Sequence, residues 1–250
     1  MKKKNLFLGL LVLGAMVFLV GCHVEVSHVT GLEGLSSVRG TSDVVSRDFD
    51  VTDFTALNIS GNYEVIWHQA TDFSLTIEMQ ENLFEYVEVN VNRNTLEIRS
   101  TRSFNTTNRN RPRIYIEAPS LDAVSFSGAI TTNNWDSITG QSFSFESAGA
   151  VNITFDLQVE SFEVSASGAG DFTFSGNSET VDITIAGASA ISASDLQTRD
   201  TSISIAGAGN VDIAVTDDLT VNITGAGRVN YIGSPAIVST ILGPGRVQQQ

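Results

Sequence analysis

Hydrophobic and polar residues alternate with a period of two along most of the chain from Arg47 onward. This alternation places apolar side chains on one face of an extended segment, so it predicts β-strands. Asn92-Arg93-Asn94 is typical of a tight hairpin turn, residues 81–87 suit one short helical turn, and the polar residues 100–112 predict a long surface loop. The strands expected in the first half are residues 55–59, 64–67, 74–78, 88–91, 95–99 and 113–117.

The second half of the chain repeats a short corner that contains glycine between small residues. Ser147-Ala148-Gly149-Ala150 is one example. The first glycines of successive corners lie 21, 19, 19, 20, 18 and 18 residues apart, and a near-constant spacing of this length predicts a solenoid. These candidate structural glycines are Gly128, Gly149, Gly168, Gly187, Gly207, Gly225 and Gly243.

Apolar residues flank each corner at fixed distances, as Phe145 and Ile153 do four positions before and after Gly149. Corners that stack on one another leave room only for small side chains. We therefore predict an all-β protein, a parallel β-helix with coils of 18–21 residues over 119–247 and a β-rich N-terminal cap over 47–118. Leu57-Asn58-Ile59-Ser60-Gly61 echoes the corner, so the first strand is expected in the same stack. Pro244 and the three final glutamines are candidates for protecting the last edge.

The N-terminus has the pattern of an export signal. Three lysines precede an apolar run of about 15 residues, which is short for a bilayer span but suits a signal peptide. The run ends in Leu19-Val20-Gly21-Cys22, which resembles the lipobox of bacterial lipoproteins. That resemblance implies a signal peptide over 1–21, acylation of Cys22 by fatty acids such as palmitate, and a lipid-anchored tether over 22–46. Because His23 rather than aspartate follows, it also implies the outer membrane in a cell with two membranes.

Charge and composition exclude several classes of function. The net charge is −14, and without the three N-terminal lysines the chain carries 11 arginines against 28 acids, or −17. This balance argues against a nucleic-acid partner, which needs clustered cations. One cysteine and three histidines make a disulfide framework or a metal centre improbable, and no motif indicates a cofactor.

Six of the eleven arginines lie between Arg93 and Arg113, which makes a local cationic patch on an acidic chain. Such a patch suits anionic lipids or acidic glycans. The candidate ligand residues are Arg102, Arg109, Arg111, Arg113 and the aromatic Trp135. The alternatives are a solvated loop whose arginines balance nearby acids, and a tryptophan that only covers the first coil.

Several motifs together resemble the autotransporter-adhesin head GIN domain family. They are Phe54-x-x-Leu57-x-Ile59-Ser60-Gly61, Tyr63-Glu64-Val65-x-Trp67-x-Gln69, Asn94-x-Leu96-x-Ile98 and the serial glycine corners. The resemblance covers about Arg47 to Val247. It implies an exported or lipid-anchored bacterial protein, and it brings no catalytic residues with it.

The function expected from these features is a non-enzymatic binding, adhesion or scaffolding module of the cell envelope. Its partners would be the membrane, through the lipid anchor, and a glycan or an envelope protein. Two alternatives stay open. One is a polysaccharide-active β-helix enzyme, which would need clustered carboxylates. The other is an envelope-stress or assembly protein that acts through a protein partner.

Overall fold

The computed structural model describes residues 37–106 and 111–250, which lie in one compact unit, Leu35–Gln250. The predicted signal peptide, the lipidation site Cys22 and the loop residue Arg109 lie outside the described residues. Within the described part of the chain, no helix has the length and apolar character needed to cross a membrane.

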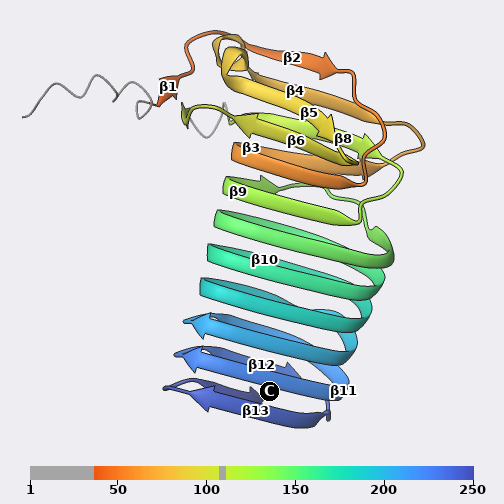
Figure 1. Cartoon of the computed structure of the whole chain (residues 1–250), viewed down its shortest axis with the longest axis vertical. Coiled ribbons are helices and arrows are strands. Elements are labelled where there is room, and N and C mark those ends of the chain that lie inside the picture. Colours follow the sequence, from red (N-terminus) through yellow and green to blue (C-terminus); the bar gives the residue numbers. More distant parts are fainter. Residues whose placement is uncertain (1–36, 107–110) are drawn as a thin grey trace, which may run out of the picture. The chain divides into compact units, whose positions relative to one another are not determined.

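The first half combines a parallel region with an antiparallel one (Figure 1). β2, β4 and β8 pair antiparallel, β3 pairs parallel with β8, and β5 and β6 form an antiparallel hairpin. The elements are β1 (Val38–Arg39), β2 (Val44–Phe49), β3 (Ala56–Gln69), β4 (Ser74–Gln80), the 3-10 helix η2 (Glu81–Tyr86), β5 (Val87–Asn92), β6 (Thr95–Ser100), β7 (Phe104–Asn105) and β8 (Arg113–Ala118).

The second half consists of strands that wind through successive stacked turns, and β10 alone passes through several of them (Figure 1). Each turn pairs parallel with the one before, so that Gly128 lies beside Gly61, Gly149 beside Gly128, and Gly225 beside Gly207. From Gly128 onward, the offset between paired corner glycines equals the spacing of the glycine corners in the sequence. The elements are β9 (Ala123–Thr132), β10 (Ile138–Gly207), β11 (Asn210–Gly225), β12 (Arg228–Ile232), β13 (Ala236–Leu242) and β14 (Arg246–Gln249).

The main sheet is mixed and does not close on itself. Its strand order runs β14-β12-β11-β10-β9-β3-β8-β4-β2, so it begins and ends on different strands. The all-β prediction is confirmed, and the first strand joins the stack as expected because β3 pairs with β9.

Two local predictions are also confirmed. Arg93 and Asn94 both have positive φ, 48° and 64°, which is the conformation that a tight hairpin turn between β5 and β6 requires. The predicted helical turn is the 3-10 helix over 81–86.

The tether prediction was wrong for its last residues. Val38–Arg39 pairs with β7, and Val44–Phe49 forms β2 on the edge of β4. Each of these short segments has too few alternating residues for its sequence to predict a strand. Each becomes a strand because it pairs with a distant strand, β7 or β4. Phe104 at the start of β7 is buried, so the segment after residue 100 is only partly a surface loop.

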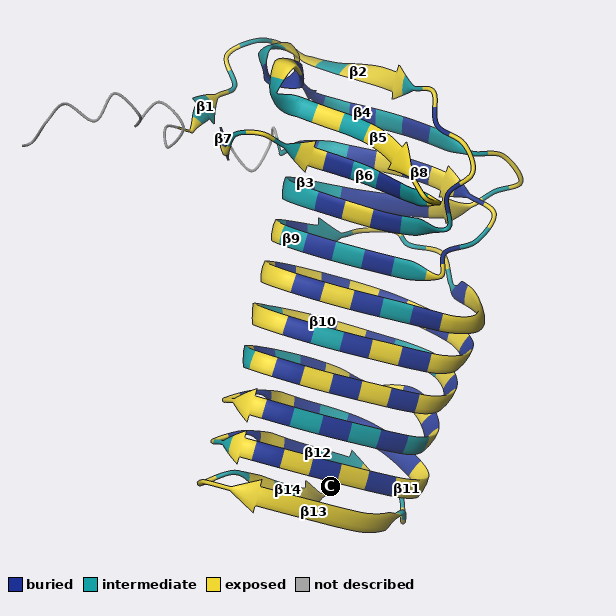
Figure 2. Ribbon diagram, viewed as in Figure 1, coloured by how far each residue is buried: buried dark blue, intermediate teal, exposed yellow. Residues whose placement is uncertain are grey.

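The core is the interior of the stack, and buried residues alternate with exposed ones along its strands (Figure 2). The columns expected to be apolar are buried, as Phe145, Ile153 and Phe155 illustrate at 0%, 3% and 0% exposure. Aromatic rings connect neighbouring turns, with ring centroids 5.5 Å apart for Phe145 and Phe172. All of the phenylalanines lie at or before residue 174, and the later turns are filled by Ile, Val, Leu and Ala.

The predicted corner glycines share one backbone conformation and one steric constraint. All seven have positive φ, between 100° and 147°. A Cβ added to Gly168 would lie 2.6 Å from the carbonyl oxygen of Gly149, in the turn before. The stacked corners therefore approach too closely for any larger residue.

Candidate functional site

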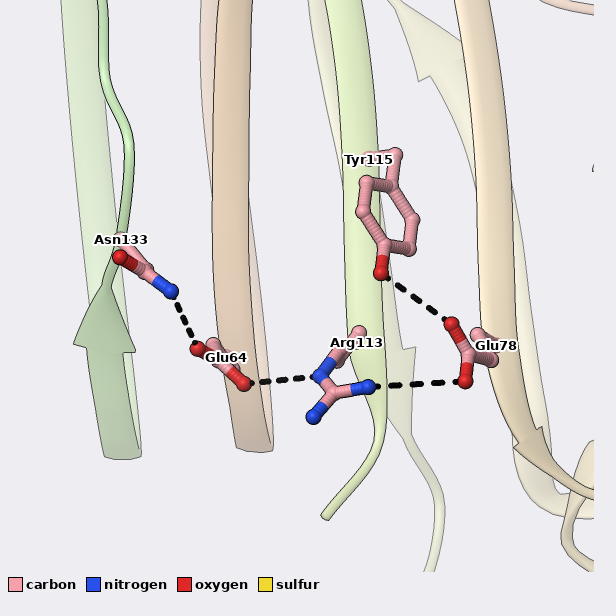
Figure 3. A network of polar contacts seen from close by, with 5 residues as sticks. All are labelled: Glu64, Glu78, Arg113, Tyr115 and Asn133. Carbon is pink, nitrogen blue, oxygen red and sulfur yellow. Dashed lines mark hydrogen bonds and ion pairs between the residues drawn. The ribbon is translucent and has the colours of Figure 1, made fainter. Parts of the chain in front are cut away.

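The predicted ligand residue Arg113 lies at the centre of a polar network on the cap (Figure 3). Its Nε donates to Glu64 at 3.0 Å, and its Nη1 lies 3.6 Å from a carboxylate oxygen of Glu78. Tyr115 donates its hydroxyl to Glu78, and Asn133 donates its amide to Glu64. These residues come from the three strands β3, β4 and β8 and from the segment after β9, so the network ties the strands of the cap to the start of the stack.

The electrostatic environment favours the charged forms of Glu64 and Arg113. Burial raises the pKa of Glu64, but hydrogen bonds from Arg113 and Asn133, with the charges of Arg113 and Arg111, outweigh burial and lower it below its usual value. The hydrogen bond to Glu64 raises the pKa of Arg113. Arg113 is thus a neutralised partner of acids rather than a free cation.

Arg111 is also engaged within the protein. Its Nη2 donates to the backbone carbonyl of Ala129 at 2.7 Å, and its Nε is buried without a hydrogen-bond partner among the described residues. Burial lowers the pKa of Arg111, and the nearby Glu64 opposes this shift. The partly buried guanidinium therefore joins the segment before β8 to β9.

Arg99 and Arg102 each contact another residue of the cap. The guanidinium of Arg102 lies over the ring of Tyr86, 5.8 Å from its centroid, and Arg99 pairs with Glu88 across the β5–β6 hairpin. Arg109 lies outside the described residues. For Arg99 and Arg113 the structure thus favours the alternative in which arginines balance nearby acids.

Trp135, the aromatic candidate for the ligand patch, is partly buried rather than fully exposed. Its ring packs against Phe155 and Trp67, with centroids 4.8 Å and 5.8 Å apart, and its Nε1 donates to the carbonyl of Val65 at 2.9 Å. The indole is partly buried against the core. It covers the first turn of the stack, which is the other role that the sequence had suggested.

An open hollow lies beside Asp136, between the end of β3 and the start of β10. Its volume is about 780 Å³, and Gln69, Pro119, Asp136 and Thr139 are among its lining residues. The backbone N–H of Gln69 donates to Asp136 and lowers its pKa, and His68 adds to this effect. Among residues 37–106 and 111–250, no group of three His, Cys, Asp or Glu side chains lies close enough to hold a metal ion.

A second depression, which we call the side groove, runs across four successive turns. Its volume is about 250 Å³, and the residues that line it recur at intervals close to the repeat. Val159 forms an apolar part of the wall, and amide, hydroxyl and charged side chains surround it. The lining residues are Val159, Asn177, Ser178, Glu179, Gln197, Thr198, Arg199 and Thr216.

Hydrogen bonds between turns hold the polar groups of the side groove in place. Asn177 donates to Gln158 at 3.0 Å, and Arg199 donates to Asp217 at 3.1 Å. Thr198 is buried and donates to the carbonyl of Ala214 at 2.9 Å. The groove therefore presents pre-ordered amide, hydroxyl and guanidinium groups on a rigid wall.

The side groove cannot be recognised in the amino-acid sequence. Its residues stand roughly ten positions after the corner glycines, on the opposite side of each turn, and are about 57 positions apart at the extremes. The only signal in the sequence is a column of polar residues at the repeat period, and many solvated columns look the same.

The family model described as "Putative auto-transporter adhesin, head GIN domain" matches residues 53–235 of this chain. The chain belongs to this family. The resemblance seen in the sequence is thereby confirmed. No curated protein sequence matches the chain.

Solved structures with the same fold come from other bacteria. A structure titled a putative adhesin from Bacteroides fragilis is 22% identical, with a TM-score of 0.77 over 86% of this chain and 100% of that one. A putative lipid binding protein from Parabacteroides distasonis is 20% identical, with a TM-score of 0.70 over 86% and 100%. A putative adhesin from Parabacteroides merdae is 21% identical, with a TM-score of 0.61 over 86% and 99%. At these identities the likeness shows the fold alone.

Proposed function

We propose that this protein is an adhesion-type binding module of the cell envelope, and that it binds its ligand without chemical conversion. Membership of the adhesin head GIN family is the observation that carries this proposal. The family and the solved neighbours reported above are named as adhesins or a binding protein, and none is named as an enzyme.

The binding surface in this proposal is the outer wall of a parallel β-helix. Parallel pairing between turns 18–21 residues apart and continuous inward columns support that description of the stack. A rigid wall keeps polar groups in fixed positions, so little conformational entropy is lost when a ligand binds.

An extended glycan is the ligand that best suits the side groove. Sugars offer many hydroxyl groups. The side-chain amides of Asn177 and Gln197 can donate and accept hydrogen bonds, and the guanidinium of Arg199 can donate them, beside the apolar Val159. Because the groove crosses four turns, several sugar units can contact it together. A protein of the envelope is the second ligand class expected from the sequence.

The module is held at the membrane through Cys22 in this proposal. The lipobox-like end of the apolar run supports a signal peptide over 1–21 and acylation of Cys22, and the family supports a role at the cell surface. Several acyl chains anchor a protein stably, since each buried methylene contributes about 0.8 kcal/mol. Replacement of Cys22 by alanine should abolish incorporation of a labelled fatty acid and release the protein from the membrane fraction.

Binding of the full chain to an array of bacterial and host glycans tests the proposed ligand. The full-length protein, purified from membranes in detergent, is compared with the variant Asn177→Ala/Gln197→Ala and with the control Asn222→Ala, an exposed amide on β11 outside the groove. We expect saturable binding that the groove variant loses and the control keeps.

Other outcomes would contradict parts of this proposal. Equal binding by the groove variant would exclude the side groove, and loss on replacing Arg102 and Arg109 instead would return attention to the arginine segment. Shortened oligosaccharides in the supernatant would establish an enzyme. Binding to no glycan, together with capture of a defined envelope protein, would favour the assembly alternative.

A further inference from the structure

The last turn of the stack exposes an apolar strand. All seven residues of β13 (Ala236–Leu242) are exposed, and in Figure 2 this strand is coloured almost entirely as exposed. Val238 and Leu242 are each 66% exposed, while Ile237 and Ile241 are 41% and 37% exposed. Exposed apolar side chains that lie together on one strand are a typical mark of an interaction site.

Both faces of β13 are apolar, unlike those of the turn before it. Its inward positions Ile237 and Ile241 continue the core columns of Leu219 and Ile223, which are fully buried in β11. Its outward positions carry Val238 and Leu242 where β11 carries Thr220 and Thr224. Among residues 37–106 and 111–250 no strand lies over the inward residues, and the outward Val238 and Leu242 replace polar residues of the wall.

The backbone of β13 also has an open edge. β13 is hydrogen-bonded to β11, and no other strand of the described residues pairs with it. Free N–H and C=O groups on such an edge are a template for another strand. Pro244, which was expected to protect this end, lies after β13 and leaves its edge open.

Electrostatic repulsion is weakest at this end of the molecule. The chain has a net charge of −14, but no Asp or Glu follows Asp218, and residues 219–250 contain Arg228 and Arg246. A strongly acidic protein repels its own copies over most of its surface. Here two copies can approach without bringing carboxylates together.

The sequence of β13 is nearly self-complementary about Ser239. In an antiparallel pair centred on Ser239, Ile237 of one copy faces Ile241 of the other, Val238 faces Thr240, and Ala236 faces Leu242. The two isoleucine pairs lie on the inward side and would join the two cores. A twofold axis requires this matching of a surface with itself.

We infer that two copies of this protein associate end to end through β13, antiparallel, with the twofold axis at Ser239. The contact continues the hydrogen bonding of the sheet from one copy into the next. It places Ile237 and Ile241 of one copy against Ile241 and Ile237 of the other on the inward side, and it sets Val238 beside Thr240 on the outer face. The inference is independent of the glycan ligand, because the side groove begins at residues in earlier turns and ends at Thr216.

Disulfide trapping in intact cells tests the register. The variant Ser239→Cys places a thiol on the axis, where directly opposed residues have Cβ atoms about 4.5–5.5 Å apart. The control Asn222→Cys places one on the exposed face of β11, one turn away. Cys22 is the single native cysteine, so the unmodified chain shows any background. We expect a band at twice the chain mass for Ser239→Cys well above that of the control and the unmodified chain.

A mass measurement on the full-length protein in density-matched detergent tests the association itself. Ile237→Glu/Ile241→Glu adds two charges at the contact, and Gln141→Glu/Ser142→Glu adds the same charges on the exposed surface of β10. We expect the unmodified chain and the β10 variant to rise to two chain masses with concentration. We expect the β13 variant to stay at one mass with an unchanged circular dichroism spectrum.

Three results would overturn the inference. One is a single chain mass for the unmodified protein up to roughly 100 μM, far above the Kd of a micromolar dimer. Another is a dimer that survives the charges in β13, since the contact would then lie elsewhere. The third is equal trapping of Ser239→Cys and Asn222→Cys, which would exclude the antiparallel register.

Discussion

Replacement of the corner residue Gly168 by alanine should destabilise the stack strongly. Gly168 has φ of +121°, a conformation that costs an L-residue about 1–2 kcal/mol. The new Cβ would also lie 2.6 Å from the carbonyl oxygen and 2.8 Å from the nitrogen of Gly149, and overpacking of this kind costs about 1–3 kcal/mol. The neighbour is backbone and cannot rotate away. The sum is about 2–5 kcal/mol, a large part of the roughly 5–15 kcal/mol that stabilises a typical domain.

The matched control is Gly140→Ala in the same long strand. Gly140 does not have positive φ in the left-handed region, and its added Cβ would meet nothing closer than the carbonyl oxygen of Ser142 at 4.0 Å. We expect this change to be neutral or to stabilise by about 0.4–1 kcal/mol. Guanidinium unfolding followed by circular dichroism measures both variants. Equal midpoints for Gly168→Ala and Gly140→Ala would refute the argument that stacked corners demand glycine.

Three further changes test the cap. Trp135→Phe keeps a ring against the core but removes the hydrogen bond to Val65, so a loss of about 1 kcal/mol in unfolding free energy is expected, and no loss would speak against that bond. The lowered pKa of Glu64 adds stability above about pH 4.5 that disappears as pH falls, so the advantage of the natural chain over Glu64→Gln should shrink between pH 7 and pH 3 in thermal melts. Burial raises the pKa of Tyr63 to about 12, so stability should fall as pH rises above 10; Tyr63→Phe should lessen that fall, and an unchanged pH profile would contradict the assignment.

The stack could be predicted because its determinants are local and repeated. Each corner glycine and each inward residue, such as Phe145 and Ile153, stands at a fixed distance within one turn. Aligning the turns in register therefore aligns the columns, and the observed pairing of Gly149 with Gly128 follows from the spacing alone.

The functional surface could not be predicted in the same way, because its contacts join distant segments. Arg113 pairs with Glu64, 49 residues away, only because β8 lies beside β3. When the pairing of β8 with β3 is unknown, six arginines in 21 residues indicate a cationic patch, and nothing in the sequence shows that Trp135 packs against the core. The short strands β1 and β2 were missed for a related reason, since their partners lie about 65 and 35 residues away.

The positions of the aromatic residues decide what spectroscopy can report about this molecule. Both tryptophans, Trp67 and Trp135, lie against each other where the cap meets the first turns, whereas Tyr231 is the single tyrosine beyond residue 115. Tryptophan emission therefore reports unfolding at the cap end of the stack, whereas far-ultraviolet circular dichroism reports unfolding of every turn. A difference between the two melting midpoints would measure directly how far the late turns, which lack phenylalanine, come apart before the early ones.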